Sequence, residues 1–263
     1  MTYLQDQQIL AACGTGGEDD DRSCYQLTPD KPEAWQGMPN LNINFCSHPT
    51  RTMENYIGGL GWLITGQEDC GGDNIATSLL TTQAQWIQPP IASPYTTAGF
   101  PAYACSVAIN SSAVIITGGV NAAGVLSSTW MLDLTDYAWT KLEDMPGPRL
   151  SHGCTMTSTG ELMIAGGYNE SDVFSVYTYN LMNSIWTQAA DLPAEMNSVD
   201  EPAMLLWNGQ PIILEDDSSN IWILQNSSSS SSSWVKMSSN LDSDFLGSWA
   251  TATLVPSGMF TCS

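Results

Sequence analysis

Two short stretches, Val114-Ile-Ile-Thr-Gly-Gly119 and Leu162-Met-Ile-Ala-Gly-Gly167, decide the fold prediction. Each is a run of β-branched and apolar residues, as in a buried strand, and each ends in a glycine pair. The glycines let the backbone turn sharply at the end of the strand. Related runs with fewer glycines occur elsewhere: Ile9-Leu-Ala-Ala-Cys-Gly14, Trp62-Leu-Ile-Thr-Gly66 and Ile212-Ile-Leu-Glu215. The chain therefore contains an internal repeat, and its fifth unit has lost the glycines.

Tryptophans form a second landmark with the same period. One follows each apolar run, and their spacings are 51, 53, 47 and 48 residues. A repeat of about 50 residues is typical of a propeller or a solenoid. We expect these residues to be equivalent by rotation and to fill the space between repeats as a buried blade core: Trp35, Trp86, Trp139, Trp186 and Trp234.

Each unit is predicted to contain four strands, A to D, separated by turns rich in Gly, Asn, Ser and Pro. In the fourth unit these strands are residues 151–157, 161–165, 172–179 and 185–187. No segment shows a helical apolar stripe. Residues 248–255 and 259–262 predict strands A and B of a sixth unit. Either the residues before Ile9 complete this unit, or the chain is part of a longer protein.

These features resemble the kelch repeat, a four-stranded blade of a β-propeller. The resemblance rests on the glycine pair after strand B, an aromatic residue in strand C and the later Trp. It covers essentially the whole chain and is weakest in unit two, where Thr77 occupies the aromatic position. The strand-C aromatic residues are Tyr25, Trp130, Tyr177 and Trp222. The predicted fold is an all-β kelch-type propeller, a single domain over residues 1–263 with five complete blades and part of a sixth.

The charge of the chain excludes several partners. Among 263 residues there are 27 Asp and Glu but only 6 Lys and Arg, which gives a net charge of −21. Nucleic acids and anionic membranes need basic side chains for binding, so we expect neither as a partner. No apolar run approaches the roughly 18 residues of a membrane span. The N-terminal residues also lack a signal-peptide pattern, which fits a cytosolic protein, a mature chain or an excerpt.

The acidic residues are predicted to gather on one rim of the propeller. The B–C and D–A connections of such a blade emerge on the same rim, and they contain 20 of the 27 acids. Solubility alone is one explanation, and attraction of a cation or a basic partner is the other. Carboxylates are the ligands that calcium prefers, although a diffuse cloud of counterions is the alternative to a specific site. The candidate calcium ligands are Asp19, Asp20, Asp216 and Asp217, and no other cofactor is expected.

Scattered cysteines, few lysines and three N-x-S sequons favour an extracellular glycoprotein. The sequons place N-linked glycans at Asn110, Asn169 and Asn226. Position along the strands predicts disulfides between Cys13 and Cys24, between Cys46 and Cys70, and between Cys105 and Cys154. Buried free thiols are the alternative, above all for the third pair, because inner strands of neighbouring blades can stand too far apart for a bridge.

The sequence gives little support for an enzyme. Its two histidines, His48 and His152, lie in different units, and we expect a structural role for His152. No nucleophile elbow or phosphate-binding loop is present. The leading hypothesis is a secreted, non-catalytic module that binds other proteins or assembles with itself. The alternatives are a carbohydrate-binding or carbohydrate-modifying propeller, in which Trp side chains would be exposed at a rim, and a cytosolic adaptor.

Overall fold

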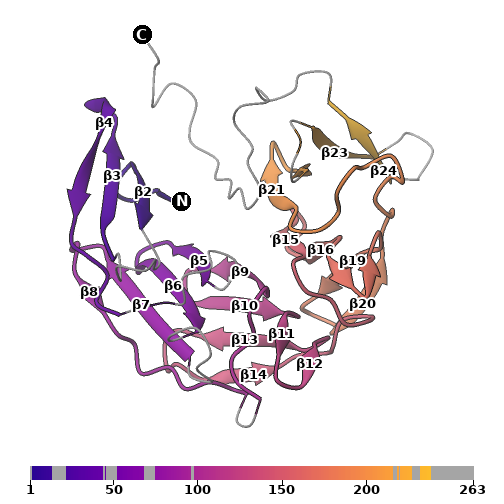
Figure 1. Ribbon diagram of the computed structural model, residues 1–263, viewed down its shortest axis with the longest axis horizontal. Coiled ribbons are helices and arrows are strands. Elements are labelled where there is room, and N and C mark those ends of the chain that lie inside the picture. Colours follow the sequence, from indigo (N-terminus) through magenta and orange to yellow (C-terminus); the bar gives the residue numbers. More distant parts are fainter. Residues whose placement is uncertain are drawn as a thin grey trace.

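The computed structural model describes residues 2–13, 22–43, 45, 52–67, 75–95, 98–215, 218, 220–226 and 232–237. Within these residues it contains five four-stranded antiparallel sheets and two short hairpins, and every regular element is a strand. The sheets follow one another around a central axis as the blades of a propeller (Figure 1). The prediction of an all-β fold with five four-stranded blades is confirmed.

Each blade is a meander whose strands A to D follow in sequence order. Blade one consists of β1 (Thr2–Leu4), β2 (Ile9–Cys13), β3 (Cys24–Thr28) and β4 (Lys31–Met38). Blade two consists of β5 (Thr52–Ile57), β6 (Gly61–Gln67), β7 (Ile75–Thr81) and β8 (Trp86–Ile87). Blade three consists of β9 (Cys105–Asn110), β10 (Ala113–Thr117), β13 (Thr129–Asp133) and β14 (Trp139–Lys141).

Blade four consists of β15 (Gly153–Met156), β16 (Leu162–Ala165), β19 (Val176–Asn180) and β20 (Ile185–Gln188). Blade five consists of β21 (Ala203–Trp207), β22 (Gln210–Leu214), β23 (Ile221–Asn226) and β24 (Ser232–Lys236). The B–C connections of blades three and four each contain a short hairpin. In blade three it is formed by β11 (Val120–Asn121) and β12 (Gly124–Val125), and in blade four by β17 (Tyr168–Asn169) and β18 (Ser171–Asp172).

Two details of the sequence prediction are corrected. The residues before Ile9 do not complete a sixth blade, because β1 pairs with β2 and is strand A of blade one. In blade two, Ser78 rather than Thr77 occupies the strand-C aromatic position: Ser78 pairs with Ile64 as Trp130 pairs with Ile116. The partial sixth blade, residues 248–255 and 259–262, lies outside the described residues.

Among the described residues the hydrophobic core is divided into four clusters, and each lies between two neighbouring blades. Between blades three and four, Ile115 of β10 packs against Leu162 and Ile164 of β16, and all three are 0% exposed. Burial of one such side chain stabilises the fold by roughly 1.5–3 kcal/mol. The strand-B runs of blades two, three and four are apolar on both faces because each of these strands lies between two other blades.

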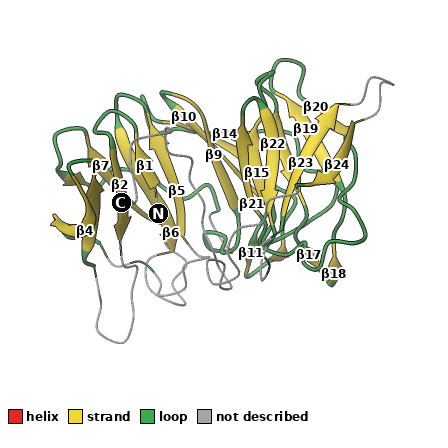
Figure 2. Cartoon of the chain, turned by 90° about the horizontal axis from the view of Figure 1, so that it is seen from above, coloured by secondary structure: helices red, strands yellow, loops and turns green. Residues whose placement is uncertain are grey.

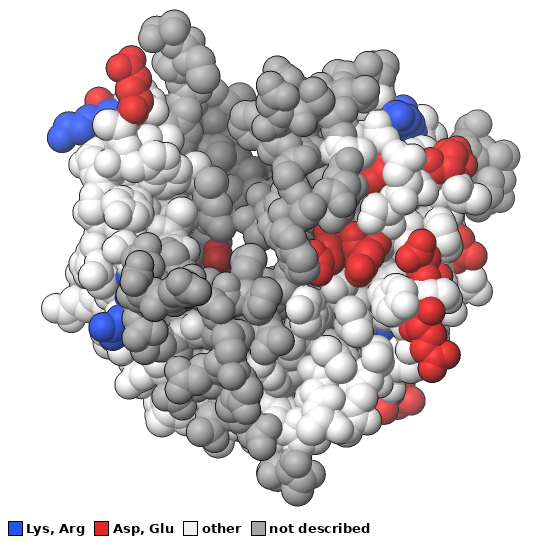
Figure 3. All heavy atoms as spheres, in the orientation of Figure 1, with Lys and Arg blue, Asp and Glu red and all other residues white. Residues whose placement is uncertain are grey.

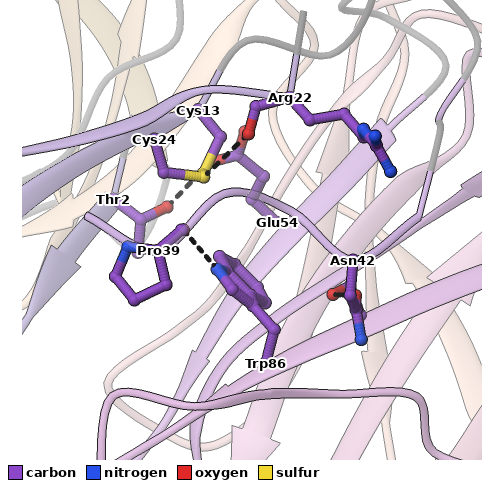
Figure 4. Close-up of a disulfide and its surroundings, with 9 residues drawn as sticks. Thr2, Cys13, Arg22, Cys24, Pro39, Asn42, Glu54 and Trp86 are labelled. Carbon is purple, nitrogen blue, oxygen red and sulfur yellow. Dashed lines mark hydrogen bonds between the residues drawn. A yellow bond between two sulfur atoms is a disulfide. The ribbon is translucent and has the colours of Figure 1, made fainter. Parts of the chain in front are cut away.

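The strand-D tryptophans link consecutive blades by a repeated hydrogen bond. In blades two to five, the indole N–H donates to a backbone carbonyl just after strand D of the preceding blade, as Figure 4 shows for Trp86 and Pro39. The four bonds join Trp86 to Pro39 (2.8 Å), Trp139 to Ala92 (2.7 Å), Trp186 to Glu143 (3.1 Å) and Trp234 to Ala190 (3.0 Å). We call this series the indole ladder.

Burial of the five tryptophans is uneven. Trp234 is buried and Trp86, Trp139 and Trp186 are half-buried. The expectation of a largely buried side chain is wrong for Trp35, which is 45% exposed. The reason is its place in the chain, since no blade precedes blade one among the described residues.

Inner strands of neighbouring blades contact one another around the axis, and polar or covalent links join them. Thr2 of β1 donates to Glu54 of β5 (3.0 Å; Figure 4), and Asn55 of β5 donates to Ser106 of β9 (2.7 Å). Between blades three and four the link is a disulfide joining Cys105 to Cys154, with a Cα–Cα distance of 6.0 Å.

A second disulfide lies within blade one. Cys13 and Cys24 are directly opposite in the register of β2 and β3, with a Cα–Cα distance of 4.1 Å (Figure 4). Two of the three expected pairs are therefore at bridging distance. Cys46 and Cys70, the remaining pair, lie outside the described residues.

The glycine pairs are required by close contact with the D–A connections before and after their blades. Gly118 has φ +60°, and a Cβ there would lie 2.5 Å from the carbonyl oxygen of Arg149. Gly167 has φ +95°, and a Cβ there would lie 2.6 Å from the carbonyl oxygen of Leu150. Only glycine allows the connection to lie this close to the end of strand B.

Replacing Gly118 with Ala is expected to destabilise the protein by more than about 2 kcal/mol, because left-handed backbone strain adds to a backbone clash. Gly160→Ala is the matched control: Gly160 has φ +78° but nothing within 4 Å of the new Cβ. It should cost about 1 kcal/mol from strain alone. Chemical denaturation of both variants measures the difference, and equal losses would contradict the close contact at Gly118.

Candidate functional site

The two rims of the propeller differ in their construction. The A–B and C–D turns lie on one rim, whereas the longer B–C and D–A connections lie on the other, where Figure 2 shows β11, β17 and β18. On this second rim the hairpin strand β17 is anchored by a bridge between Leu150 and Tyr168, and Ala102 and Val120 make the matching bridge in blade three. The rim therefore consists of connections tied to one another by backbone hydrogen bonds.

Six exposed carboxylates surround blade four on the second rim. They belong to the connection before blade four, to its β17–β18 hairpin and to the connection after it. Figure 3 views this rim and shows Asp and Glu gathered over the later blades, with few Lys or Arg. We define the acidic rim by these residues: Glu143, Asp144, Glu170, Asp172, Asp191 and Glu195.

Part of the negative charge of the acidic rim is offset by an ion pair and by hydrogen bonds within the molecule. Lys141 of β14 forms an ion pair with Asp144, and both side chains are exposed. Asp191 accepts hydrogen bonds from the backbone N–H of Val176 (3.4 Å) and from Gln188 (3.2 Å). Glu170 has φ +60° at the tip of its hairpin, and its side chain is exposed. The strand prediction also assigned acids to this rim that lie outside the described residues, among them Asp19, Asp20, Asp216 and Asp217.

Arg149 and His152 lie beneath this rim, between blades three and four. The buried guanidinium of Arg149 donates to the carbonyl oxygens of Gly166 (3.2 Å) and Ser175 (3.0 Å) and stacks over the ring of Tyr177. The Nε2 atom of His152 lies 2.7 Å from the hydroxyl of Thr117. Burial, aided by the charge of Arg149, lowers the pKa of His152 to about 3 and keeps it neutral. The Arg149 side chain joins the D–A connection to blade four. The His152 side chain reaches Thr117 of blade three, in agreement with the structural role expected for His152.

Sequence reasoning did not identify Arg149, although it directly precedes the strand-A region of the best-defined unit. The signal available was a basic residue in a chain that has only six of them. Its acceptors lie 17 and 26 residues further along the chain, so the local sequence does not reveal them.

Glu215 takes the place of the first glycine of the pair in blade five. Its carboxylate is 1% exposed and accepts hydrogen bonds from Asn220 (2.7 Å), Trp222 (3.2 Å) and the backbone N–H groups of Asn197 and Ser198. Burial raises the pKa of Glu215, but these four donors outweigh burial and hold the pKa below its ordinary value. In this blade a buried carboxylate, rather than a glycine pair, joins the blade to the preceding connection.

The expected glycosylation sites lie at three different places. Asn110 is exposed in the A–B turn of blade three, where its side-chain oxygen accepts hydrogen bonds from the N–H (2.7 Å) and hydroxyl (3.1 Å) of Ser112. Asn226 ends β23, next to the C–D turn on the same rim. Asn169 is half-buried in β17 and lies on the opposite rim, beside the acidic residues.

No group of three or more His, Cys, Asp or Glu side chains that could hold a metal occurs among the described residues. The four expected calcium ligands, Asp19, Asp20, Asp216 and Asp217, are all outside that part of the chain, so the calcium site stays a prediction. In the same part of the chain there is no helix long and apolar enough to cross a membrane.

Glu215→Gln is expected to lose about 1–3 kcal/mol at neutral pH, because an amide cannot accept all four hydrogen bonds. The pKa of Glu215 is lower in the folded state, so its contribution is present above the unfolded pKa of about 4.3 and fades as pH falls through the folded value. Urea unfolding from pH 7 to pH 3 should show the difference from the native chain shrinking. Glu170→Gln, on the exposed hairpin, should stay within about 0.5 kcal/mol throughout.

Comparison with known proteins agrees with the architecture. No family model matches the chain. Kelch domain-containing protein 10 of Xenopus tropicalis is 34% identical over 152 residues, which are 56% of this chain and 34% of that protein. The protein of the same name from Xenopus laevis is 32% identical over 152 residues, with the same shares. The match spans about a third of the length of these relatives. The sequence similarity to these kelch proteins and the five four-stranded blades together support a kelch-type β-propeller.

Proposed function

We propose that the chain is a non-catalytic protein-interaction module of an extracellular protein, and that a basic protein surface binds its acidic rim. The observation that carries this proposal is the concentration of six exposed carboxylates on the connections around blade four. Connections held on a rigid frame are common binding surfaces. A carboxylate cluster on such a frame attracts a basic partner and speeds its association.

An extracellular location is supported by the cysteines. Cys13 with Cys24 and Cys105 with Cys154 form disulfides, which persist in oxidising compartments and are rare in the cytosol. Glycans at Asn110 and Asn226 would cover the rim of the A–B and C–D turns. The acidic rim would then be the more accessible of the two faces, for a protein partner or for a second copy with bound calcium offsetting the repulsion.

The carbohydrate alternative is less well supported. A sugar site would need Trp side chains stacked and exposed at a rim, whereas the indole N–H groups of four strand-D tryptophans are directed to carbonyls between blades. The cytosolic-adaptor alternative differs from our proposal in a measurable property, because it requires free thiols and unmodified Asn side chains.

Neutralising the acidic rim should weaken binding of a basic ligand. We expect Glu170→Gln with Asp172→Asn to weaken binding of a decalysine peptide several-fold in 50 mM salt and much less in 300 mM salt, because salt screens exposed charges. The control pair, Glu33→Gln with Asp136→Asn, removes two exposed acids away from this rim. Fluorescence anisotropy measures both affinities. Equal weakening by the two pairs would show that only overall charge matters and would overturn the proposal.

Mass spectrometry of the protein isolated from its natural source tests the compartment. We expect N-glycans on at least one of Asn110, Asn169 and Asn226. We also expect Cys13, Cys24, Cys105 and Cys154 to resist alkylation until a reductant is added. A bare intact mass with every thiol alkylated before reduction would instead support the cytosolic adaptor.

A further inference from the structure

The hairpin of β17 and β18 presents an aromatic ring beside a carboxylate. Tyr168 and Asp172 are directly opposite in its register. Directly opposite residues of an antiparallel pair project from the same face, with Cβ atoms about 4.5–5.5 Å apart. Both residues are exposed, and Tyr168 has an exposed fraction of 39%, whereas Asn169 alternates to the other face and is half-buried. We call Tyr168 and Asp172 the rim pair.

The backbone of this hairpin is fixed at its base. Tyr168 and Leu150 exchange two backbone hydrogen bonds, at 2.9 Å and 3.0 Å, and the N–H of Val173 donates to the carbonyl oxygen of Gly167 (2.9 Å). Figure 2 shows β17 and β18 at the edge of the molecule. The backbone positions of the rim pair are therefore set before a partner arrives, which lowers the cost of ordering them on binding.

No interaction within the described part of the chain occupies the side chains of the rim pair, either by a hydrogen bond, an ion pair or a ring contact. The equivalent hairpin of blade three has a matching bridge, between Ala102 and Val120, and there Val120 is opposite Val125. A hairpin of this kind therefore needs neither an aromatic ring nor a charge at the two positions. The ring and the carboxylate of blade four are available for a ligand.

We propose that the rim pair binds an arginine side chain of the basic partner, an inference that rests on the proposed function of the acidic rim. A guanidinium is planar, so it can stack on the ring of Tyr168 while its N–H groups donate to the carboxylate of Asp172. The molecule contains one such stack already, since the guanidinium carbon of Arg149 lies 5.6 Å from the ring centroid of Tyr177. A lysine ammonium is a compact point charge without a planar face to stack.

Charge attraction without any preference for arginine is the competing interpretation. The carboxylates of the acidic rim attract any cationic surface, because the Coulomb energy depends on charge and distance and not on the shape of the cation. Stacking on Tyr168 adds a contribution that depends on shape. An exposed cation–π contact corresponds to about a two- to fivefold gain in affinity. Peptides of equal charge but different cationic groups separate the two interpretations.

Deca-arginine and decalysine provide this comparison by fluorescence anisotropy in 150 mM salt. The measured quantity is the ratio of their two dissociation constants, in the native chain and in each variant. We expect Tyr168→Leu to lower the preference for deca-arginine about two- to fivefold, because leucine has no π face. Tyr168→Phe should keep the preference, because the ring and not the hydroxyl makes the contact. The control Tyr25→Leu removes a ring on blade one that is 46% exposed, and it should leave the ratio unchanged.

The possible failures of this experiment are distinguishable. An unchanged ratio in Tyr168→Leu would overturn the arginine site and leave the proposed function standing, because both peptides would still bind the carboxylates. Binding of neither peptide to the native chain would overturn the proposed function and the arginine site together. An equal loss of preference in Tyr25→Leu and Tyr168→Leu would contradict the assignment to the rim pair.

A double-mutant cycle tests whether the two side chains of the rim pair bind the same group. If Tyr168 and Asp172 hold one guanidinium, loss of either weakens the contribution of the other. The variant with both Tyr168→Leu and Asp172→Asn should then lose at least twofold less affinity for deca-arginine than the product of the two single losses. Glu33→Gln, on blade one, is the control, and its effect should simply multiply with that of Tyr168→Leu. Simple multiplication in both cycles would overturn the shared site.

Discussion

Contact between neighbouring blades is the interaction on which the rest of this structure depends. A four-stranded blade has two apolar faces and cannot bury either of them alone. The side chains of Ile115, Leu162 and Ile164 are completely buried only because two blades enclose them. The indole ladder adds directional hydrogen bonds to this packing. Each bond runs from one blade to the connection that follows strand D of the blade before it. Stability in such an array is the sum of blade and interface contributions.

The same constraint determines where functional residues can lie. Strand B of each blade is apolar and has no room for a charged site, so the charged side chains lie in the other strands and in the connections. Where a connection passes close to a strand end, small or specially bonded residues are needed, and Gly118, Gly167 and Glu215 are three solutions to that requirement. The parts of the connections that lie away from the strand ends are not limited to such residues. The exposed carboxylates around blade four lie in these parts.

The repeat itself could be predicted from the sequence because its landmarks are local. A strand-B run with its glycine pair and a Trp about 20 residues later identify a blade without any knowledge of its neighbours. Properties that depend on a neighbouring blade could not be predicted. Trp35 is the same residue type at the same register as Trp234, yet one is half-exposed and the other is buried. The strand-C position in blade two, assigned to Thr77 instead of Ser78, was wrong by one residue because pairing, not spacing, defines it. Two of the four donors to Glu215 come from a connection 17 and 18 residues earlier, which spacing does not reveal either.

The disulfide joining Cys105 to Cys154 changes how this array can come apart. A series of repeats tends to fray inward from its ends, one unit at a time, because each unit is held only by its neighbours. Because this disulfide joins the inner strands of blades three and four, these two blades stay together after the outer blades have unfolded. The middle of the propeller is then the last part to lose its order. The connections around blade four are fixed to this most persistent part of the molecule, so a partner bound there would be released only after most of the protein had unfolded.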